Sequence, residues 1–250
     1  MSPISPISPK QRVIATDITI ASEKEFVVNI FALAAERKGS YVTFTNVHML
    51  MEARHDAEFA AIVNGADMAM ADGAPVALYL KHKRNIAQPR LPGMDMLPLL
   101  LAEAERRGKS VYFYGGQQHV LDAIAAKISA DLPMLKVAGL VSPPFRPLSP
   151  VEEVALIDHI VQADPDLIFV ALGCPRQEKW MAAHKGQIKG VMLGVGQAFL
   201  TFAGLEKRLP PWLRKLPVEW IYRLALEPRR LFKRYFITNS TFLWAVLRGE

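Results

Sequence analysis

Two side chains that could take part in acid–base chemistry follow apolar runs of this chain. Asp72 comes directly after the run at 66–71, and the adjacent Gly73 lets a ligand approach the backbone closely. A carboxylate placed in this way can take a proton from a substrate hydroxyl, as a general base does. Asn46 lies near the end of the run at 41–47, and His48 follows that run. Since Asp and Asn also cap helices, the residues alone leave both roles open.

Glycines and polar side chains mark two further strand ends. Gly115 and Gly116 precede a helical pattern whose first N–H groups could hold a phosphate, although the spacing falls short of the dinucleotide fingerprint G-x-G-x-x-G. A polar set follows Gly173, in which Gln177 could hydrogen-bond a sugar or a base edge and Arg176 could meet a phosphate. No histidine is identifiable as a base for Cys174, so we expect a structural role for this thiol.

Strand and helix patterns alternate along most of the chain. Apolar runs at 41–47, 66–71, 110–116, 135–141, 166–173 and 190–196 indicate buried strands. Helical spacing is found at 23–39, 49–66, 93–108, 117–133 and 149–165. This alternation predicts an α/β fold, a mostly parallel Rossmann-like sheet with helices on both faces, plus a basic helical C-terminal appendage. Ligands bind such sheets at the carboxyl ends of the strands, where the polar residues above lie.

The composition favours a folded intracellular protein with three segments. About half of the 250 residues are apolar, and the chain has one cysteine. It contains no apolar run long enough to span a bilayer, and its N-terminal residues lack the apolar core of a signal peptide. We therefore expect a cytoplasmic location. The proline-rich segment 1–15 is predicted to be a flexible tail, residues 16–204 the α/β core, and residues 205–250 a basic amphipathic appendage in which Pro228 starts a new helix.

The positive charge of the chain is concentrated near its C-terminus. Residues 207–234 contain nine Lys and Arg but only Glu219 and Glu227, so this segment carries +7 whereas the whole chain carries +6. Four aromatic side chains are interleaved with the basic ones: Trp212, Trp220, Tyr222 and Phe232. Such a segment is suited to phosphate, either on a substrate, on anionic lipid or on nucleic acid.

Ordered motifs between residues 40 and 235 resemble the WecG/TagA/CpsF glycosyltransferases, glycosyltransferase family 26. The motifs that carry the resemblance are Asn46; Asp72-Gly73; Arg90, Gly93 and Asp95; Gly115-Gly116; Pro165-Asp166 through Gly173, Pro175, Gln177 and Glu178; Gly194-Val195-Gly196 with Phe199; Ala203-Gly204; Arg208, Pro210 or Pro211, and Trp212; Glu219-Trp220 with Arg223; and Glu227-Pro228 with Arg230.

The resemblance implies transfer, with inversion, of an N-acetylmannosamine-type or uronic acid sugar. The donor would be a UDP-sugar, and the acceptor a polyprenyl-diphosphate-linked saccharide of cell-surface polysaccharide synthesis. By the same analogy Asp72 is the general base, Asn46 orients sugar hydroxyls, and Gln177 helps to hold the donor or the acceptor. It further implies that no cofactor or divalent metal is needed, so that one or more of Arg208, Arg214, Arg223 and Arg230 stabilise the leaving diphosphate. The other residues expected to bind substrate are Thr45, His48, Arg90, Asp95, Gly115, Gly116, Pro175, Arg176, Glu178, Gly194 and Gly196.

Three features depart from the family pattern or imitate another one. Phe44 stands where many relatives have threonine, between Thr43 and Thr45, and 197–200 reads Gln-Ala-Phe-Leu where relatives often carry glycine and aspartate. A pocket contact is expected to differ at both places. The string Asp164-Pro165-Asp166 spells a D-x-D metal motif, but it precedes its strand and so lies at the sheet edge opposite the crevice. We reject it as a metal site.

Two other functions compete with a membrane-bound glycosyltransferase. A nucleic-acid-binding module would use the basic aromatic segment, but confinement of the charge to that segment argues against it. A UDP-sugar-modifying enzyme such as an epimerase or dehydrogenase is disfavoured because the G-x-G-x-x-G fingerprint is missing. The expected partners are therefore a UDP-sugar, a lipid-linked acceptor and a possible second copy of the chain, with no nucleic acid. The appendage is expected to bind peripherally to the anionic inner face of the cell membrane.

Overall fold

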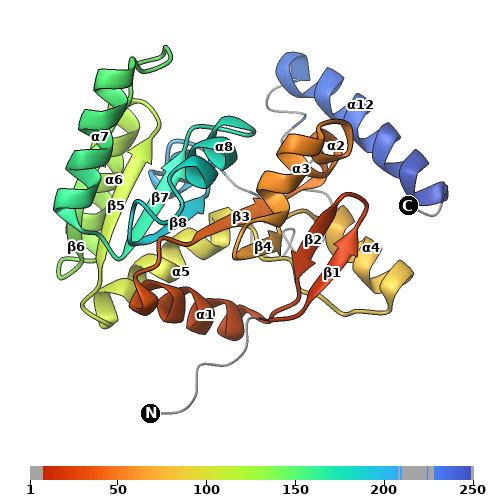
Figure 1. Ribbon diagram of the computed structural model, residues 1–250, viewed down its shortest axis with the longest axis horizontal. Helices are drawn as coiled ribbons and strands as arrows, with labels where there is room; N and C mark the ends of the chain where they lie inside the picture. Colours follow the sequence, from red (N-terminus) through yellow and green to blue (C-terminus); the bar gives the residue numbers. More distant parts are fainter. Residues whose placement is uncertain (1–7, 208, 210–223, 225–227, 249–250) are drawn as a thin grey trace.

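The computed structural model describes residues 8–207, 209, 224 and 228–248. Its core is a six-stranded sheet in which every neighbouring pair is parallel, in the order β4-β3-β8-β7-β5-β6 (Figure 1). The strands are β3 Tyr41–Thr45, β4 Met68–Ala71, β5 Ser110–Gly115, β6 Lys136–Val141, β7 Leu167–Ala171 and β8 Val191–Gly194. Each lies within a run predicted as a strand, and the predicted α/β fold is confirmed.

Helices cover both faces of the sheet because alternate strand residues supply apolar side chains to each face. Phe113, Phe169 and Leu193 belong to one cluster, whereas Tyr112, Ile168 and Met192 belong to the other. The first face is covered by α1 Glu23–Glu36, α5 Gly93–Arg106, α6 Gln118–Asp131 and the short α9 Ala198–Phe202. The second face is covered by α7 Pro150–Ala163 and α8 Arg176–Ala183.

The segment before the sheet and the helical segment after β3 each differ from the prediction. Strand β1 (Lys10–Val13) pairs antiparallel with β2 (Thr16–Thr19), so the predicted flexible tail 1–15 is wrong for residues 10–15. The turn between the strands buries Val13 and Thr16 completely, which anchors it. The single helix predicted at 49–66 is two helices, α2 (Val47–His55) and α3 (Ala57–Asn64), because the Asp56 side chain accepts a hydrogen bond from the Phe59 N–H and starts a new helix.

Two helices at the C-terminal side of the molecule pack against each other. Helix α12 (Pro228–Leu247) begins at Pro228, as predicted, and lies beside α2 (Figure 1). Its Phe242 ring lies 6.4 Å from that of Tyr79 on α4 (Ala74–Arg84), a helix that the sequence analysis did not predict. Ala245 is fully buried at this contact. The appendage therefore touches the core in its last four turns.

Asp166 has a structural role at the amino ends of the strands. Its carboxylate accepts hydrogen bonds from the backbone N–H of Ser110 at 2.9 Å and from Lys109 at 3.1 Å, and Arg37 lies 3.8 Å away. Burial alone would raise the pKa of Asp166, but the bonds from Ser110 and Lys109 outweigh it and hold the pKa below its usual value. Asp164 instead pairs with Arg37 at the surface. The Asp164-Pro165-Asp166 string therefore lies at the sheet edge opposite the carboxyl ends of the strands, as predicted.

Replacing Asp166 by alanine should destabilise the protein by about 1–3 kcal/mol, because the Ser110 N–H and two cationic side chains lose their acceptor. Urea unfolding followed by circular dichroism measures this loss. Asp164→Ala, at the other acidic position of the motif, should cost far less because the Asp164 side chain is 65% exposed. Equal losses in the two variants would contradict the structural role.

Candidate active site

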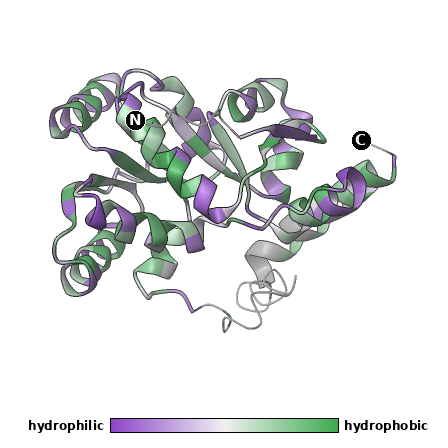
Figure 2. Cartoon of the chain, turned by 90° about the horizontal axis from the view of Figure 1, so that it is seen from below, coloured by the Kyte–Doolittle hydropathy of each residue, from purple (hydrophilic) through white to green (hydrophobic). Residues whose placement is uncertain are grey.

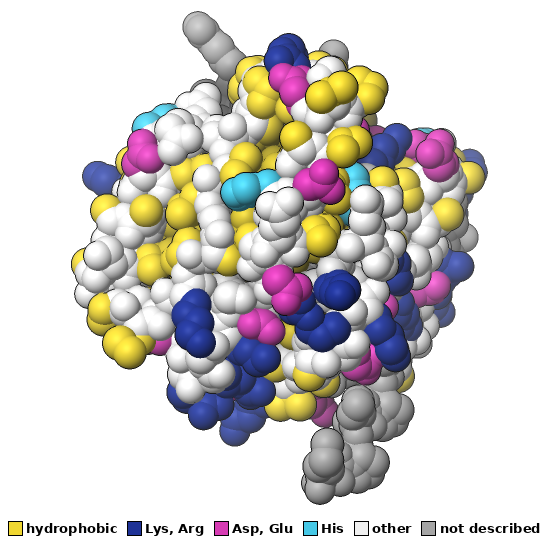
Figure 3. Space-filling model, turned by 60° about the vertical axis from the view of Figure 1, so that its left-hand side comes forward, with side chains coloured by type: hydrophobic (Ala, Val, Ile, Leu, Met, Phe, Trp, Pro, Cys, Tyr) yellow, Lys and Arg dark blue, Asp and Glu magenta, His cyan; other side chains and the backbone are white. Residues whose placement is uncertain are grey.

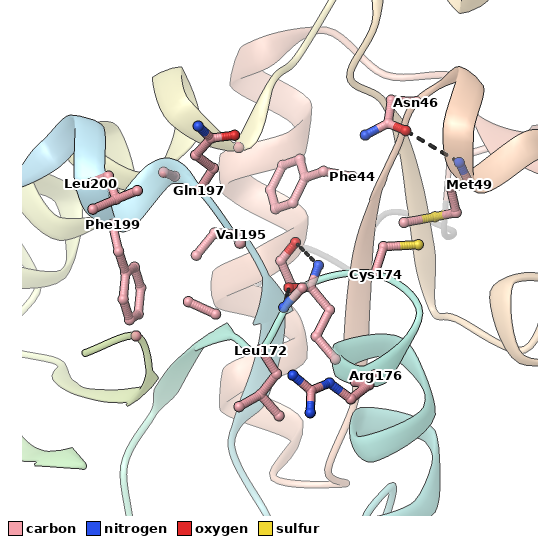
Figure 4. Close-up of a pocket in the computed structure, with 18 of the residues that line it drawn as sticks. Phe44, Asn46, Met49, Leu172, Cys174, Arg176, Val195, Gln197, Phe199 and Leu200 are labelled. Atoms are coloured by element: carbon pink, nitrogen blue, oxygen red, sulfur yellow. Dashed lines mark hydrogen bonds between the residues drawn. The ribbon is translucent and has the colours of Figure 1, made fainter. Parts of the chain in front are cut away.

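A cleft of about 1360 Å³ opens at the carboxyl ends of the strands. The chain segments that follow all six strands line it, together with the loop before α5 and one face of α12. Figure 4 shows Asn46, Cys174, Arg176 and Gln197 around it, each from a different element or loop. Residues far apart in the sequence meet here because parallel strands bring their carboxyl ends to one edge, as the sequence analysis expected.

Asn46 and Asp72 lie side by side on the cleft wall. The Asn46 Nδ2 amide lies 3.4 Å from Asp72 Oδ2, while its Oδ1 accepts the N–H of Met49 at 3.2 Å and caps α2 (Figure 4). The cap fixes the orientation of the amide, since Oδ1 must face the N–H and Nδ2 then points to the carboxylate. The capping and cleft roles left open for Asn46 therefore coexist. Asp72 does not cap α4, whose N-cap is Gly73.

The Gly115–Gly116 pair forms the turn between β5 and α6. Gly115 has φ 113°, and a Cβ atom there would lie 2.4 Å from the carbonyl oxygen of Ala171 on the neighbouring strand. Gly116 lines the cleft, and its carbonyl accepts a hydrogen bond from the Ser142 hydroxyl at 2.8 Å. The pair thus lets β5 and β7 approach each other at the floor of the cleft. Helix α6 begins two residues after Gly116, with Gln117 as its N-cap.

Gln177 ties two strand ends together and is only 5% exposed. Its Oε1 accepts from the Gly173 N–H at 3.2 Å, and its Nε2 donates to the Gly194 carbonyl at 3.0 Å and to Glu178 at 2.7 Å. Both amide hydrogens are therefore used within the protein. A Cβ atom at position 194 would lie 3.1 Å from Gln177 Nε2, so the glycine leaves room for the amide. Although Gln177 lines the cleft, this geometry favours positioning of the turn over direct catalysis.

Some predicted substrate contacts are not on the cleft surface. Thr45 and Glu178 are completely buried, and neither they nor Asp95, Gly115 and Pro175 line the cleft. Thr45 packs beside Thr43, Asp95 and Glu178 lie in the first turns of α5 and α8, and Pro175 is the N-cap of α8. Direct substrate contact through these residues stays a prediction. The predicted residues that do line the cleft are Asn46, His48, Asp72, Arg90, Gly116, Arg176, Gln177, Gly194 and Gly196.

Positive charge reaches the cleft from the core. Arg90 precedes α5, and the exposed Arg176 is the first residue of α8. His48 also lines the cleft, with its Nδ1 3.7 Å from the Glu52 carboxylate one turn along α2. Arg208, Arg214 and Arg223 lie outside the described residues, and so does the side chain of Arg230 on α12. Within the described chain, His, Cys, Asp and Glu form no cluster of three that could hold a metal.

The sequence analysis missed several groups that line the cleft. The loop after β6, residues 142–148, lines the cleft and carries Phe145, which is 93% exposed. Arg146 in the same loop donates two hydrogen bonds to the Glu152 carboxylate. The exposed Phe145 ring offers a face on which a base can stack. The strand ending at Val141 and the prolines of Ser142-Pro143-Pro144-Phe145 could have indicated this loop. Gln197, at one position that departs from the family pattern, donates to Glu206 at 2.8 Å.

The fold and the cleft define an α/β protein with a polar cleft at the carboxyl edge of a parallel sheet. The chain matches the Glycosyl transferase WecG/TagA/CpsF family over residues 11–250. It is 31% identical over 216 residues to an N-acetylglucosaminyldiphosphoundecaprenol N-acetyl-beta-D-mannosaminyltransferase of Bacillus subtilis (strain 168), covering 86% of this chain and 82% of that protein. It is 27% identical over 228 residues to the Staphylococcus aureus (strain NCTC 8325 / PS 47) protein of the same name, covering 89% and 87%. The chain belongs to the WecG/TagA/CpsF family of glycosyltransferases.

Replacing Gln177 by leucine should lower the unfolding free energy by about 1–3 kcal/mol, because the Gly173 N–H and the Gly194 carbonyl lose their partner at a buried position. Chemical denaturation measures the loss. Gln187→Leu provides the same substitution at an exposed position and should leave the unfolding free energy unchanged. Normal stability in the Gln177 variant would contradict the bracing role.

Proposed function

We propose that this glycosyltransferase moves an N-acetylmannosamine-type sugar from UDP to a polyprenyl-diphosphate-linked saccharide. The relatives named above transfer N-acetylmannosamine to N-acetylglucosaminyldiphosphoundecaprenol, as their names state. The observation that best supports the proposal here is the Asn46–Asp72 pair on the wall of a cleft large enough for two substrates. A uronic acid donor is the alternative sugar, because Phe44 and the segment 197–200 depart from the family pattern.

In the proposed reaction Asp72 takes the proton of the acceptor hydroxyl. The acceptor oxygen then attacks the anomeric carbon of the donor from the side opposite UDP, and the bond to UDP breaks with its electron pair on the phosphate oxygen. One C–O bond forms as another breaks, so the anomeric configuration inverts. The Asn46 amide donates toward Asp72 Oδ2, and in this scheme it orients the carboxylate toward the acceptor hydroxyl.

The leaving UDP carries negative charge that cationic side chains can stabilise. Arg90 and Arg176 line the cleft and support this part of the proposal. Arg208, Arg214, Arg223 and Arg230 remain proposed contributors from the appendage. In this scheme arginines take the place of a divalent metal, and the UDP-sugar is a substrate, so no cofactor is required.

We further propose peripheral attachment to the inner face of the cell membrane through the appendage. Within the described chain, no helix is long and apolar enough to cross a bilayer. Helix α12 nevertheless exposes a row of large apolar side chains along its outer face, and Figure 2 shows it at the periphery of the molecule. The row consists of Phe232, Phe236, Leu243 and Leu247, exposed by 59–76%. An amphipathic helix next to a basic segment is suited to an anionic lipid surface.

A nucleic-acid-binding function receives less support from the surface. On the face in Figure 3, Lys and Arg side chains of the lower half are accompanied by Asp and Glu, so this face does not present a continuous basic stripe. A UDP-sugar-modifying enzyme would need a redox or deprotonation partner for the sugar carbons. The turn Gly115–Gly116 does not extend to the dinucleotide fingerprint that would bring such a cofactor.

Asp72→Asn should reduce turnover by about 100-fold or more, the scale of a lost general base, while UDP binding stays within about twofold. Product formation from UDP-sugars and a short-chain lipid-diphosphate acceptor, identified by mass, measures turnover and also names the donor. Asp122→Asn at the surface of α6 is the matched control and should keep full activity. Near-normal turnover in the Asp72 variant would exclude this residue as the base.

The triple variant Phe236→Ser, Leu243→Ser and Leu247→Ser should bind vesicles of phosphatidylglycerol and phosphatidylcholine at least about tenfold more weakly, because burying one large apolar side chain contributes about 1.5–3 kcal/mol. Co-sedimentation at low salt measures binding. Val151→Ser with Val154→Ser removes equally exposed apolar groups from α7, at 79% and 61% exposure, and should bind like the wild type. Unchanged binding by the α12 variant would refute attachment through this face.

A further inference from the structure

In the part of the chain that the structure describes, one carboxyl group is completely buried without a cation beside it. Glu178 has no exposed surface, and its Oε2 atom has no hydrogen-bond partner among the described residues. It forms no ion pair among those found in the described residues. Buried carboxylates are ordinarily paired or hydrogen-bonded on both oxygens, since an isolated buried charge is costly. The position of Glu178 therefore needs an explanation beyond packing.

The other oxygen of Glu178 has one well-defined partner. Oε1 accepts from Gln177 Nε2 at 2.7 Å. The direction of this bond is fixed, because Gln177 Oε1 faces the Gly173 N–H and its Nε2 also faces the Gly194 carbonyl, which can only accept. Without Glu178, one of the two Nε2 hydrogens would be buried without an acceptor. The carboxyl thus completes the set of contacts that holds the Gln177 amide.

The Gln177 amide in turn supports the turn after β8. No side chain separates them: a Cβ atom at Gly194 would lie 3.1 Å from Gln177 Nε2, and one at Gly196 would lie 3.4 Å from Gln177 Oε1. Gly196 has φ 52°, a conformation that disfavours other residues. Both glycines line the cleft. A change in the Gln177 amide would therefore be transmitted to the cleft wall.

We propose that Glu178 is a positioning residue that acts through Gln177 to hold the Gly194–Gly196 turn, and that it does so as a neutral carboxylic acid. The expected effect of Glu178 on catalysis rests on the proposed transfer reaction. The expected effect of Glu178 on the stability of the protein does not.

The surroundings of Glu178 favour the neutral form. Burial raises the pKa of Glu178 to about 7, and the hydrogen bond from Gln177 only partly opposes the rise. The titratable groups on elements packed against α8 are engaged elsewhere. Asp56 of α3 lies 3.9 Å from Lys179, Glu153 of α7 lies 3.7 Å from His184, and the Tyr41 hydroxyl of β3 donates to Ile62.

The stability of the protein should then depend on pH in a defined direction. Because the pKa of Glu178 rises from the ordinary 4.5 to about 7 on folding, the folded protein binds the extra proton between these values. The contribution of Glu178 to stability is complete below about pH 4.5 and is lost as the pH rises through about 7. Glu178→Gln has the same shape and does not ionise. Its melting temperature relative to the wild type should therefore increase between about pH 5 and about pH 8.

Two variants and one control test the inference. Glu178→Gln should retain kcat/KM within about threefold, whereas Glu178→Met, which keeps the volume and removes the acceptor, should lose about 10–100-fold and bind UDP more weakly. Glu58→Gln removes an exposed carboxylate from the first turn of α3 and should change neither activity nor the pH dependence of melting. UDP release, calorimetric titration with UDP and melting curves across pH supply the readouts.

Each outcome decides a part of the inference. Wild-type activity in Glu178→Met would overturn the positioning role, and equal loss in the Gln and Met variants would show that a charge is needed, which overturns the neutral acid. A melting difference that does not change with pH would overturn it as well, even if the Met variant failed to fold. If the wild type transferred no sugar at all, the proposed function would fail, while UDP titration and the melting curves would still test Glu178.

Discussion

The cleft depends on the need to satisfy backbone groups at the two edges of the parallel sheet. At the amino edge, strands begin with N–H groups, and carboxylates accept from them: Asp67 from Tyr41 at 3.0 Å and Asp166 from Ser110 at 2.9 Å. At the carboxyl edge, unpaired carbonyls need donors, and these come from the Gln177 amide and the Ser142 hydroxyl. A carboxylate has no such task at the carboxyl edge. Asp72 is therefore unusual there, and its proposed role as a base follows from this contrast.

The acidic groups near the cleft differ in environment, and this difference separates their roles. Asp72 is half-buried on the cleft wall and receives a donor from Asn46. Glu178 lies behind the wall, has no exposed surface, and receives its donors from the protein itself. A carboxylate that handles protons must reach the substrate, whereas one that holds an amide in place functions best when water and substrate are excluded. The chain thus uses one group for each requirement.

The sequence predicted the sheet and the location of the cleft because strand periodicity and strand-end residues are local signals. The strand runs at 110–116 and 166–173 contain β5 and β7, and Asn46 and Asp72 stand at strand ends as expected. That their strands β3 and β4 are neighbours is shown only by the structure. Side-chain direction was harder to predict, because it depends on packing. Thr45 and Glu178 belong to polar motifs, yet both are completely buried. Phe145 was not predicted because a single exposed aromatic residue leaves no periodic pattern in the sequence. The inferred segment boundaries at 204 and 205, and a second copy of the chain as partner, stay predictions.

The packing of α12 on α2 has a thermodynamic consequence for ligand binding. Thr238, Asn239 and Phe242 of α12 line the cleft, while the same helix rests on α2, whose N-cap is Asn46. A ligand that touches these three residues gains its contacts only while α12 is docked. Binding in the cleft and docking of the helix must then strengthen each other by the same factor, since linkage between two equilibria is reciprocal. Whatever surface holds α12 in place would raise the affinity of the cleft for its substrate, and a bound substrate would tighten the hold of that surface.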